Sequence, residues 1–300
     1  MGHQFLPDRP VDEARSAEAV RQGGLPLRAQ RRIWEMNQAQ RPLVTSTLGP
    51  AETLVAGMTG LEPVSQVMGS SVYHVGFGNY RSSWTGGELQ NLTVAYEQAR
   101  SRALSRMQQE AALLRAHAVV DVRFERRGYE WADELVEFTA VGTAVRLRGA
   151  PPTDQPALTL LTTGQLWKLH HAGYWPVGIA IGNCFWYEPH ADCASEGSWF
   201  SQELPAHTRA ATTSRDLAVE RFRGFAHHFN AHGVVGVKVV RYARDHEWET
   251  ENNNRTTVHT AFHIEMVLMG TAVVRRGDAA PPPRPKLVVD LRDLVRRPSR

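Results

Sequence analysis

A length of 300 residues is enough for about two domains of ordinary size, and the 42% hydrophobic and 22% charged residues are typical of a globular protein. The net charge of +3 is too slight to indicate a nucleic-acid surface, and neither an apolar run of roughly 20 residues nor a signal-peptide core is visible. With two cysteines, too few for a disulfide framework, the composition predicts a cytoplasmic protein without membrane or nucleic-acid partners.

The first 40 residues are expected to form an arm followed by a short helix. Residues 1–24 are polar and contain prolines and a Gly-Gly pair, which predicts a mobile arm. In residues 25–36 the apolar residues can share one side while the arginines face water. This pattern predicts a helix that packs onto the first domain.

Two stretches of the chain repeat each other at a constant spacing of 115 residues. Residues 88–124 match residues 203–239, and the Ala-His pair that ends at His117 recurs at His232. A constant spacing over such a length indicates an internal duplication. Each copy reads as a long helix that runs into a β-branched strand.

A short helix is expected near the start of each copy. In the first copy Pro50 begins the pattern and Gly60 ends it, which is the asymmetry that helix termini favour. In the second copy Thr163 is the expected N-cap and Gly173 the expected stop.

A strand follows in each copy, over residues 63–76 and 176–189. Both strands are interrupted at a matched glycine, Gly69 and Gly182. A glycine inside a strand pattern predicts a bulge, a turn or a close approach of another backbone segment.

The long helix has an apolar stripe with different side chains in the two copies. Alanines and Met107 form the stripe in the first copy, while Phe222, Phe225 and Phe229 take over in the second. At 1.5 Å per residue the helix reaches roughly 40 Å, more than a small sheet can cover. We therefore expect it to pack against the sister domain or another subunit, and we expect the two helices to face different neighbours.

Each copy ends in a β-hairpin whose returning strand carries the sequence GTAV. The second hairpin contains a polar insertion at residues 245–257, expected to be a solvated loop at its tip. Proline-rich linkers follow each hairpin.

We therefore divide the chain into an arm and short helix (1–40), a first domain (41–149), a second domain (150–280) and a C-terminal Pro-rich linker and docking segment (281–300). The final segment is apolar with arginines and is expected either to add a strand to a neighbour's sheet or to dock as a peptide on a protein partner.

The order of these elements resembles the YbjQ family, also called UPF0145, whose members carry a helix ending in GADAVVG and then a GTAV strand. The first copy has the pair Ala99-Arg100, then AHAVVDVRF at residues 116–124 and VGTAVRLRG at residues 141–149. The family's Gly-Ala-Asp is replaced here by Arg-Ala-His and Asn-Ala-His. The resemblance covers both copies.

This resemblance implies an α+β fold with two tandem dodecin-like, YbjQ-like domains, each a small antiparallel sheet packed on one long helix. It also implies assembly into pentameric rings with strands shared between subunits, and it brings a heavy-metal label without an established enzymatic activity. Whole two-domain chains cannot close a ring of five domains in one layer, so either two rings stack or the ring number changes.

Metal ligation is considered for the stretch CFWYEPHADC, which contains Cys184, His190 and Cys193 together with Glu188 and Asp192. Thiolate, imidazole and carboxylate groups together can bind zinc or a similar divalent ion. The spacing is not that of a zinc finger, and the first copy does not repeat the set. The alternative is a loop with a half-buried cysteine.

The remaining histidines have simpler interpretations. His228 and His232 are four residues apart, but His232 is expected to lie past the helix end. For His117 and His232 we expect a charge that complements the helix C-terminus. His259 and His263 fit a solvated strand.

Enzymatic motifs such as G-x-S-x-G, a P-loop or H-E-x-x-H are absent, so we expect no enzyme, no catalytic residue and no cofactor. The leading hypothesis is a non-enzymatic, self-assembling homo-oligomer built as a ring or scaffold, with terminal segments that bind partners. The alternative is a heavy-metal sensor or store that uses the Cys184–Cys193 loop.

Overall fold

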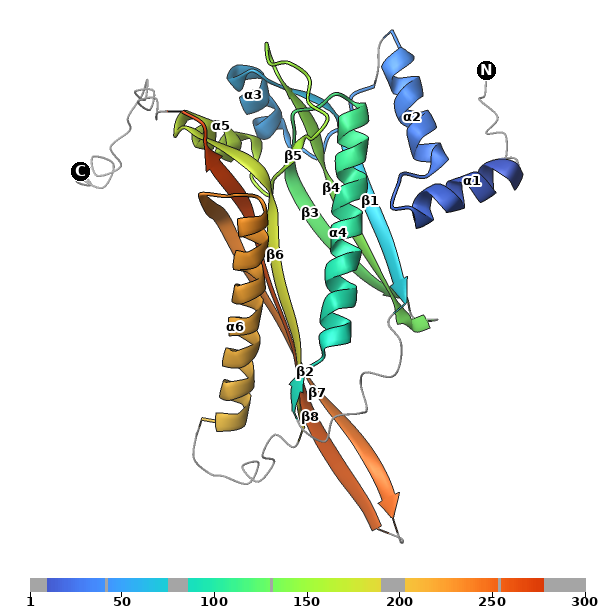
Figure 1. The fold of residues 1–300 in the computed structure, drawn as a ribbon, viewed down its shortest axis with the longest axis vertical. Coiled ribbons are helices and arrows are strands. Elements are labelled where there is room, and N and C mark those ends of the chain that lie inside the picture. The colour runs from blue at the N-terminus through green and yellow to red at the C-terminus, as the bar shows by residue number, and fades with distance from the viewer. Residues whose placement is uncertain are drawn as a thin grey trace, which may run out of the picture.

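A computed structural model describes residues 10–40, 43–74, 86–129, 132–189, 203–252 and 255–277 (Figure 1). The predicted C-terminal docking segment lies outside these ranges, as do the first nine residues and the candidate ligands His190 and Cys193.

Within these described ranges the chain forms two four-stranded sheets. Neighbouring strands are antiparallel in both, except that β5 runs parallel to β3. The first sheet has the order β1 (Leu61–His74), β4 (Ala132–Leu147), β3 (Ala118–Tyr129) and β5 (Ala157–Leu158). The second has the order β2 (Gly87–Glu88), β6 (Tyr174–Pro189), β8 (Arg255–Arg275) and β7 (Gly233–Asn252).

Two long helices separate and cover these sheets. Helix α4 (Gln90–Leu113) packs against β1 and β4 of the first sheet and against β6 of the second, whereas α6 (Pro205–His228) packs on β6 and β8 (Figure 1). The layers are therefore first sheet, α4, second sheet and α6. The expectation that the long helix needs cover beyond its own sheet is confirmed for α4.

Short helices complete the chain. Helices α3 (Pro50–Thr59) and α5 (Thr163–His171) pack on each other, and α2 (Leu27–Gln38) packs on α4. The Ile33 side chain of α2 is buried in the same cluster as Val67 of β1, as the predicted amphipathic pattern requires. None of the helices in the described ranges is both long and apolar enough to cross a membrane.

The two copies exchange short strands, which the sequence did not predict. Strand β2 precedes α4 in the chain but pairs with β6 of the second sheet, and β5 follows the first hairpin but extends the first sheet beside β3. The reason is geometric, because α4 lies between the sheets and its N-terminus emerges at the edge of β6. Each sheet is thus completed by residues from the other copy.

The matched glycines Gly69 and Gly182 mark the close approach of each long helix. A Cβ atom on Gly69 would lie 2.0 Å from the carbonyl oxygen of Ala103, and one on Gly182 would lie 2.1 Å from that of Ala218. Of the three predicted alternatives, the close backbone approach is confirmed. The register shifts lie elsewhere, near the first residues of β1 and β6.

The expected contrast between an alanine stripe and a phenylalanine stripe is only partly right. Of the three phenylalanines of the second stripe, Phe222 is buried, while Phe225 and Phe229 are half-buried. Small side chains also line the sheet side of α6, namely Ala210, Ser214 and Ala218. The close contact at Gly182 leaves no room for larger groups there.

Three local expectations were wrong. Residues 10–21 form helix α1 (Pro10–Arg21) rather than a mobile arm, and the Ser16 hydroxyl in its middle accepts from the N–H of Leu27, the first residue of α2. The cap of α5 is Thr162, one residue before the predicted position, and it forms a capping box with Gln165. The polar insertion does not form a loop, because it extends β7 and β8 into a longer hairpin that ends at Asn252 and Arg255.

Candidate functional site

The junction between the two copies brings together the polar and charged groups that the fold buries. Strand β5 is held beside β3 by the Thr159 N–H, which donates to the Val119 carbonyl at 3.0 Å. Beyond β5 the Val122 N–H donates to the Thr159 carbonyl at 3.1 Å, and the Asp121 N–H to the Leu161 carbonyl at 2.9 Å. Asp121 adopts a positive φ of 53°, which turns its N–H toward the incoming strand.

The threonine of each GTAV sequence fixes the segment before the short helix. The Thr271 hydroxyl oxygen accepts from the Leu160 N–H at 3.1 Å and lies 3.0 Å from the Thr159 hydroxyl. In the first copy the Thr143 hydroxyl accepts from the Thr47 N–H at 2.9 Å. The sequence marked GTAV as a shared fingerprint but gave no sign of this role.

A charged triad crosses the junction. The guanidinium of Arg100 on α4 lies 3.2 Å from a carboxylate oxygen of Glu265 on β8, and Arg126 on β3 contacts the other oxygen. Burial lowers the pKa of Arg100, although Glu265 opposes the change. For Arg126 burial is outweighed by the carboxylate of Glu265, and its pKa is raised.

Aromatic side chains surround this triad. The Tyr96 ring lies 4.4 Å from the Phe185 ring of the second sheet and 5.2 Å from the Phe138 ring of the first, both edge to face. The Arg100 guanidinium stacks 4.8 Å from the Phe138 ring centre. Tyr96 therefore joins both sheets and shields the ion pair from water.

A second ion pair crosses the junction at Cys184. Arg221 on α6 lies 2.7 Å from the Glu88 carboxylate of β2. The Cys184 thiol is buried in the same place, and burial, followed by the negative charge of Glu88, raises its pKa to about 12. Of the predicted metal ligands the structure therefore describes Cys184, as a protonated core thiol, and Glu188, which accepts from the Trp186 indole N–H at 3.0 Å and lies 3.4 Å from Arg209.

His117 and His232 do not cap the helices as expected. The Nδ1 atom of His117 accepts from the Leu147 N–H at 3.0 Å, and that of His232 accepts from the Arg275 N–H at 3.2 Å. Since Nδ1 accepts, His117 is the neutral tautomer whose Nε2–H donates to the Pro151 carbonyl at 2.7 Å. Each ring ties the turn after the long helix to the last strand of its copy.

A groove of about 600 Å³ near this turn contains His117, His170 and His171. The His171 Nδ1 is engaged with the Trp167 carbonyl at 3.0 Å, and both ring nitrogens of His117 are used. Within the described ranges, no three His, Cys, Asp or Glu side chains gather as metal ligands. The geometry therefore offers structural roles for these histidines.

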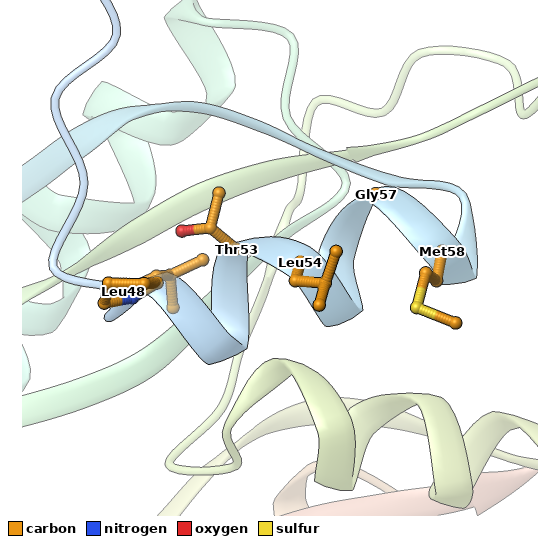
Figure 2. Close-up of a pocket in the computed structure, with 6 residues that line it drawn as sticks. Leu48, Thr53, Leu54, Gly57 and Met58 are labelled. Carbon is orange, nitrogen blue, oxygen red and sulfur yellow. The ribbon is translucent and has the colours of Figure 1, made fainter.

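Apolar side chains remain exposed away from the junction. Figure 2 shows Leu54 and Met58 on α3 and the half-buried Leu48 just before it, around a surface hollow of about 620 Å³. Other exposed apolar residues lie before α3, on β1 and on β7: Leu43, Val44, Met68, Val72, Val237, Val239 and Tyr242. Such patches on a folded chain are typical of interaction surfaces.

Known proteins match the chain over either one copy or most of its length. The YbjQ family model, described as "Putative heavy-metal-binding", matches residues 52–148. An encapsulin nanocompartment protein of Mycobacterium tuberculosis is 35% identical over 247 residues, covering 78% of this chain and 86% of that protein.

Two UPF0145 proteins match a shorter part of the chain. The protein of Saccharolobus islandicus is 38% identical over 101 residues, 32% of this chain and 86% of its own length. That of Halorubrum lacusprofundi is 37% identical over 98 residues, 31% of this chain and 92% of its own length. No solved structure matches the chain.

Proposed function

The chain belongs to the YbjQ (UPF0145) family, and from this premise we propose that it is a non-enzymatic protein that assembles with further copies of itself through tandem YbjQ-like domains. The observation that carries the proposal is the set of exposed apolar side chains on α3, β1 and β7. These positions lie on strand edges and helix faces, where an uncovered apolar surface favours association.

The M. tuberculosis relative supports the same function, since it is named as a protein of an encapsulin nanocompartment and matches most of both chains. A compartment is an assembly of many chains. The ring nitrogens of His117 and both carboxylate oxygens of Glu265 also support a structural protein, because they are engaged within the fold.

Light scattering after size-exclusion chromatography tests the proposal. We expect a particle several times the 33.5 kDa mass of one chain at micromolar concentration. A stable species of 33.5 kDa would contradict it. A pentamer-related ring, or two stacked rings, is the form that the family resemblance favours, and the measured mass distinguishes them.

Heavy-metal binding is the second candidate, and the family description is the observation that favours it. The described donor does not fit well, because Cys184 keeps its proton between Glu88 and Arg221. Metal analysis of the purified protein and of a Cys184→Ser, Cys193→Ser variant tests this candidate. Equal metal content in both would remove the Cys184–Cys193 loop as the site.

A protein partner for residues 281–300 is also a proposal. Truncation after Pro285 is expected to abolish co-purification of that partner while leaving the particle mass unchanged. Loss of the particle itself would instead assign the segment to self-assembly.

A further inference from the structure

The junction inside one chain can serve as a template for a contact between two chains. A residue of the first copy is matched with the second-copy residue that lies a fixed number of positions later. This spacing is 113 residues from Val44 to the end of β1, 115 over the long helix and the strand after it, and 128 over the GTAV strand. Each residue on the first-copy side of the junction therefore has a counterpart in the second copy, and the reverse also holds. These counterparts lie on the two outer sides of the molecule, which we call the outer layers (Figure 1). One outer layer is α6 together with β7, the edge strand of the second sheet, and the other is the first sheet.

From this correspondence we propose that the chain joins a second copy head to tail, with residues 44–48 of one chain added as a parallel strand beside β7 of the next. The contact repeats the pairing of β5 with β3. It rests on the proposed self-assembly and specifies the surface by which it occurs.

The edge of β7 has the same backbone shape as the edge that receives β5. Strand β7 is the last strand of the second sheet, and Gly236 has a φ of 64°, as its counterpart Asp121 has a φ of 53°. At the inner junction this kink accompanies the hydrogen bond from the Asp121 N–H to the carbonyl of Leu161, just beyond β5. Val237, counterpart of the buried Val122, is exposed, as expected of an edge that awaits a strand.

The added segment is already held in the required place. The Thr143 hydroxyl lies 2.8 Å from the Thr47 hydroxyl and 3.2 Å from that of Ser46, as the Thr271 hydroxyl holds the residues after β5. Val44 of this segment is 51% exposed, and the preceding Leu43 is 82% exposed. Little conformational entropy would therefore be lost when the segment pairs.

The charged triad is repeated across the two outer layers. The counterparts of Arg100 and Arg126 are Arg215 and Arg241 on the α6 and β7 side, and the counterpart of Glu265 is Glu137 on β4. Both arginines are exposed in the single chain. One outer layer therefore carries two positive charges and the other carries one negative charge. These opposite charges favour contact between unlike layers, that is, a head-to-tail contact.

The apolar face of α3 follows the same rule. At the inner junction α5 packs on α3, and Leu166 of α5 is buried with Ala56 of α3. The counterpart of Leu166 is Thr53, which lines the hollow next to Leu54 and Met58, and these two side chains are 66% and 79% exposed (Figure 2). In the proposed contact the hollow is covered by α5 of the neighbouring chain.

Such a contact uses two different surfaces, so it closes into a ring or continues as a filament. A two-fold dimer would instead place the same surface on both sides. This difference can be measured with single-cysteine variants, because a two-fold contact allows one variant to link to itself.

Mixed cysteine variants test the register. By analogy with Val119 and Leu158, Val234 of one chain should lie opposite Thr45 of the next. In a Cys193→Ser background, where the remaining Cys184 is buried, we expect oxidation to link Val234→Cys chains to Thr45→Cys chains only in the mixture. The control mixture contains Arg209→Cys in place of Val234→Cys. The counterpart of Arg209 is Val94, which stays exposed beside the inner junction, so Arg209 should lie outside the proposed contact and should form no link.

Charge reversal tests the triad without disturbing the core. We expect Arg241→Glu and Glu137→Arg each to raise the concentration at which the particle dissociates by about tenfold or more. The double variant should restore it, and Arg209→Glu should leave it unchanged. Circular dichroism on each variant establishes that the chain is folded.

The outcomes separate this contact from self-assembly in general. A wild-type chain that stays at 33.5 kDa overturns both proposals. A particle that forms but shows no link in the Val234→Cys and Thr45→Cys mixture, or is insensitive to both charge reversals, overturns this contact alone. Links within unmixed Thr45→Cys protein would assign a two-fold contact instead.

Discussion

The inner junction and the outer layers contain corresponding residues in opposite environments. Val122 is buried beside β5, whereas its counterpart Val237 is exposed on β7, and Arg100 is buried against Glu265, whereas Arg215 is exposed. The local sequence is similar in each pair. Whether such a residue is buried therefore depends on the surface that packs against it and not on its local sequence. The exposed residue of each pair indicates where the proposed neighbouring chain would pack.

The largest expected effect concerns the close contact between strand glycine and long helix, which occurs in both copies. We expect Gly69→Ala and Gly182→Ala each to lower the free energy of unfolding by about 3 kcal/mol or more, because the new methyl would overlap a helix carbonyl. Chemical denaturation at fixed protein concentration measures it. The control is Gly224→Ala, which meets no neighbouring atom in α6 and should stabilise by about 0.5–1 kcal/mol. If either variant lost less stability than an ordinary surface substitution does, the long helix would be able to move away from the added methyl group.

Neutralising a glutamate should lower the stability of the fold more at the inner junction than on the outer layer. Glu265→Gln leaves Arg100 buried without its counter-charge and should cost about 3 kcal/mol of stability. Glu137→Gln, at the corresponding outer position, should change the folding of one chain by less than about 1 kcal/mol. Equal losses in thermal unfolding of the two variants would contradict the comparison.

Alkaline pH should weaken the junction through Cys184. Its folded pKa of about 12 lies above the ordinary 9.0, so the folded chain keeps a proton that the unfolded chain releases as pH rises. The resulting stability is complete below pH 9 and falls by about 2 kcal/mol near pH 10.5. Cys184→Ala should lack this part of the pH dependence in denaturation curves. An identical slope in both proteins would refute the assignment.

The smallest expected effect concerns the GTAV threonines. Thr271→Val removes the oxygen that accepts from the Leu160 N–H and should cost about 1–2 kcal/mol. Thr143→Val should cost a similar amount, since it removes the bond from Thr47. Thr212→Val on the exposed part of α6 is the control and should stay within about 0.5 kcal/mol. A loss confined to Thr271→Val would show that only the inner segment depends on its threonine.

The sequence determined most of the longer helices and strands because these depend on local patterns, and it singled out Gly69 and Gly182 without choosing among a bulge, a turn and a close approach. The strand predicted over residues 63–76 is β1, Leu61–His74, and Gly69 is in close contact as one of its alternatives required. The repeat also determined which residues correspond. Periodicity and composition act over a few residues, so they are readable from one chain.

Only the tertiary structure decided which copy completes which sheet. The exchange of β2 and β5, the partnership of Arg100 with Glu265 and the neutral tautomer of His117 all depend on residues distant in sequence. A two-residue strand has no period that a sequence could reveal. Its place is fixed by the position of α4 between two sheets, which is a property of packing and not of local sequence.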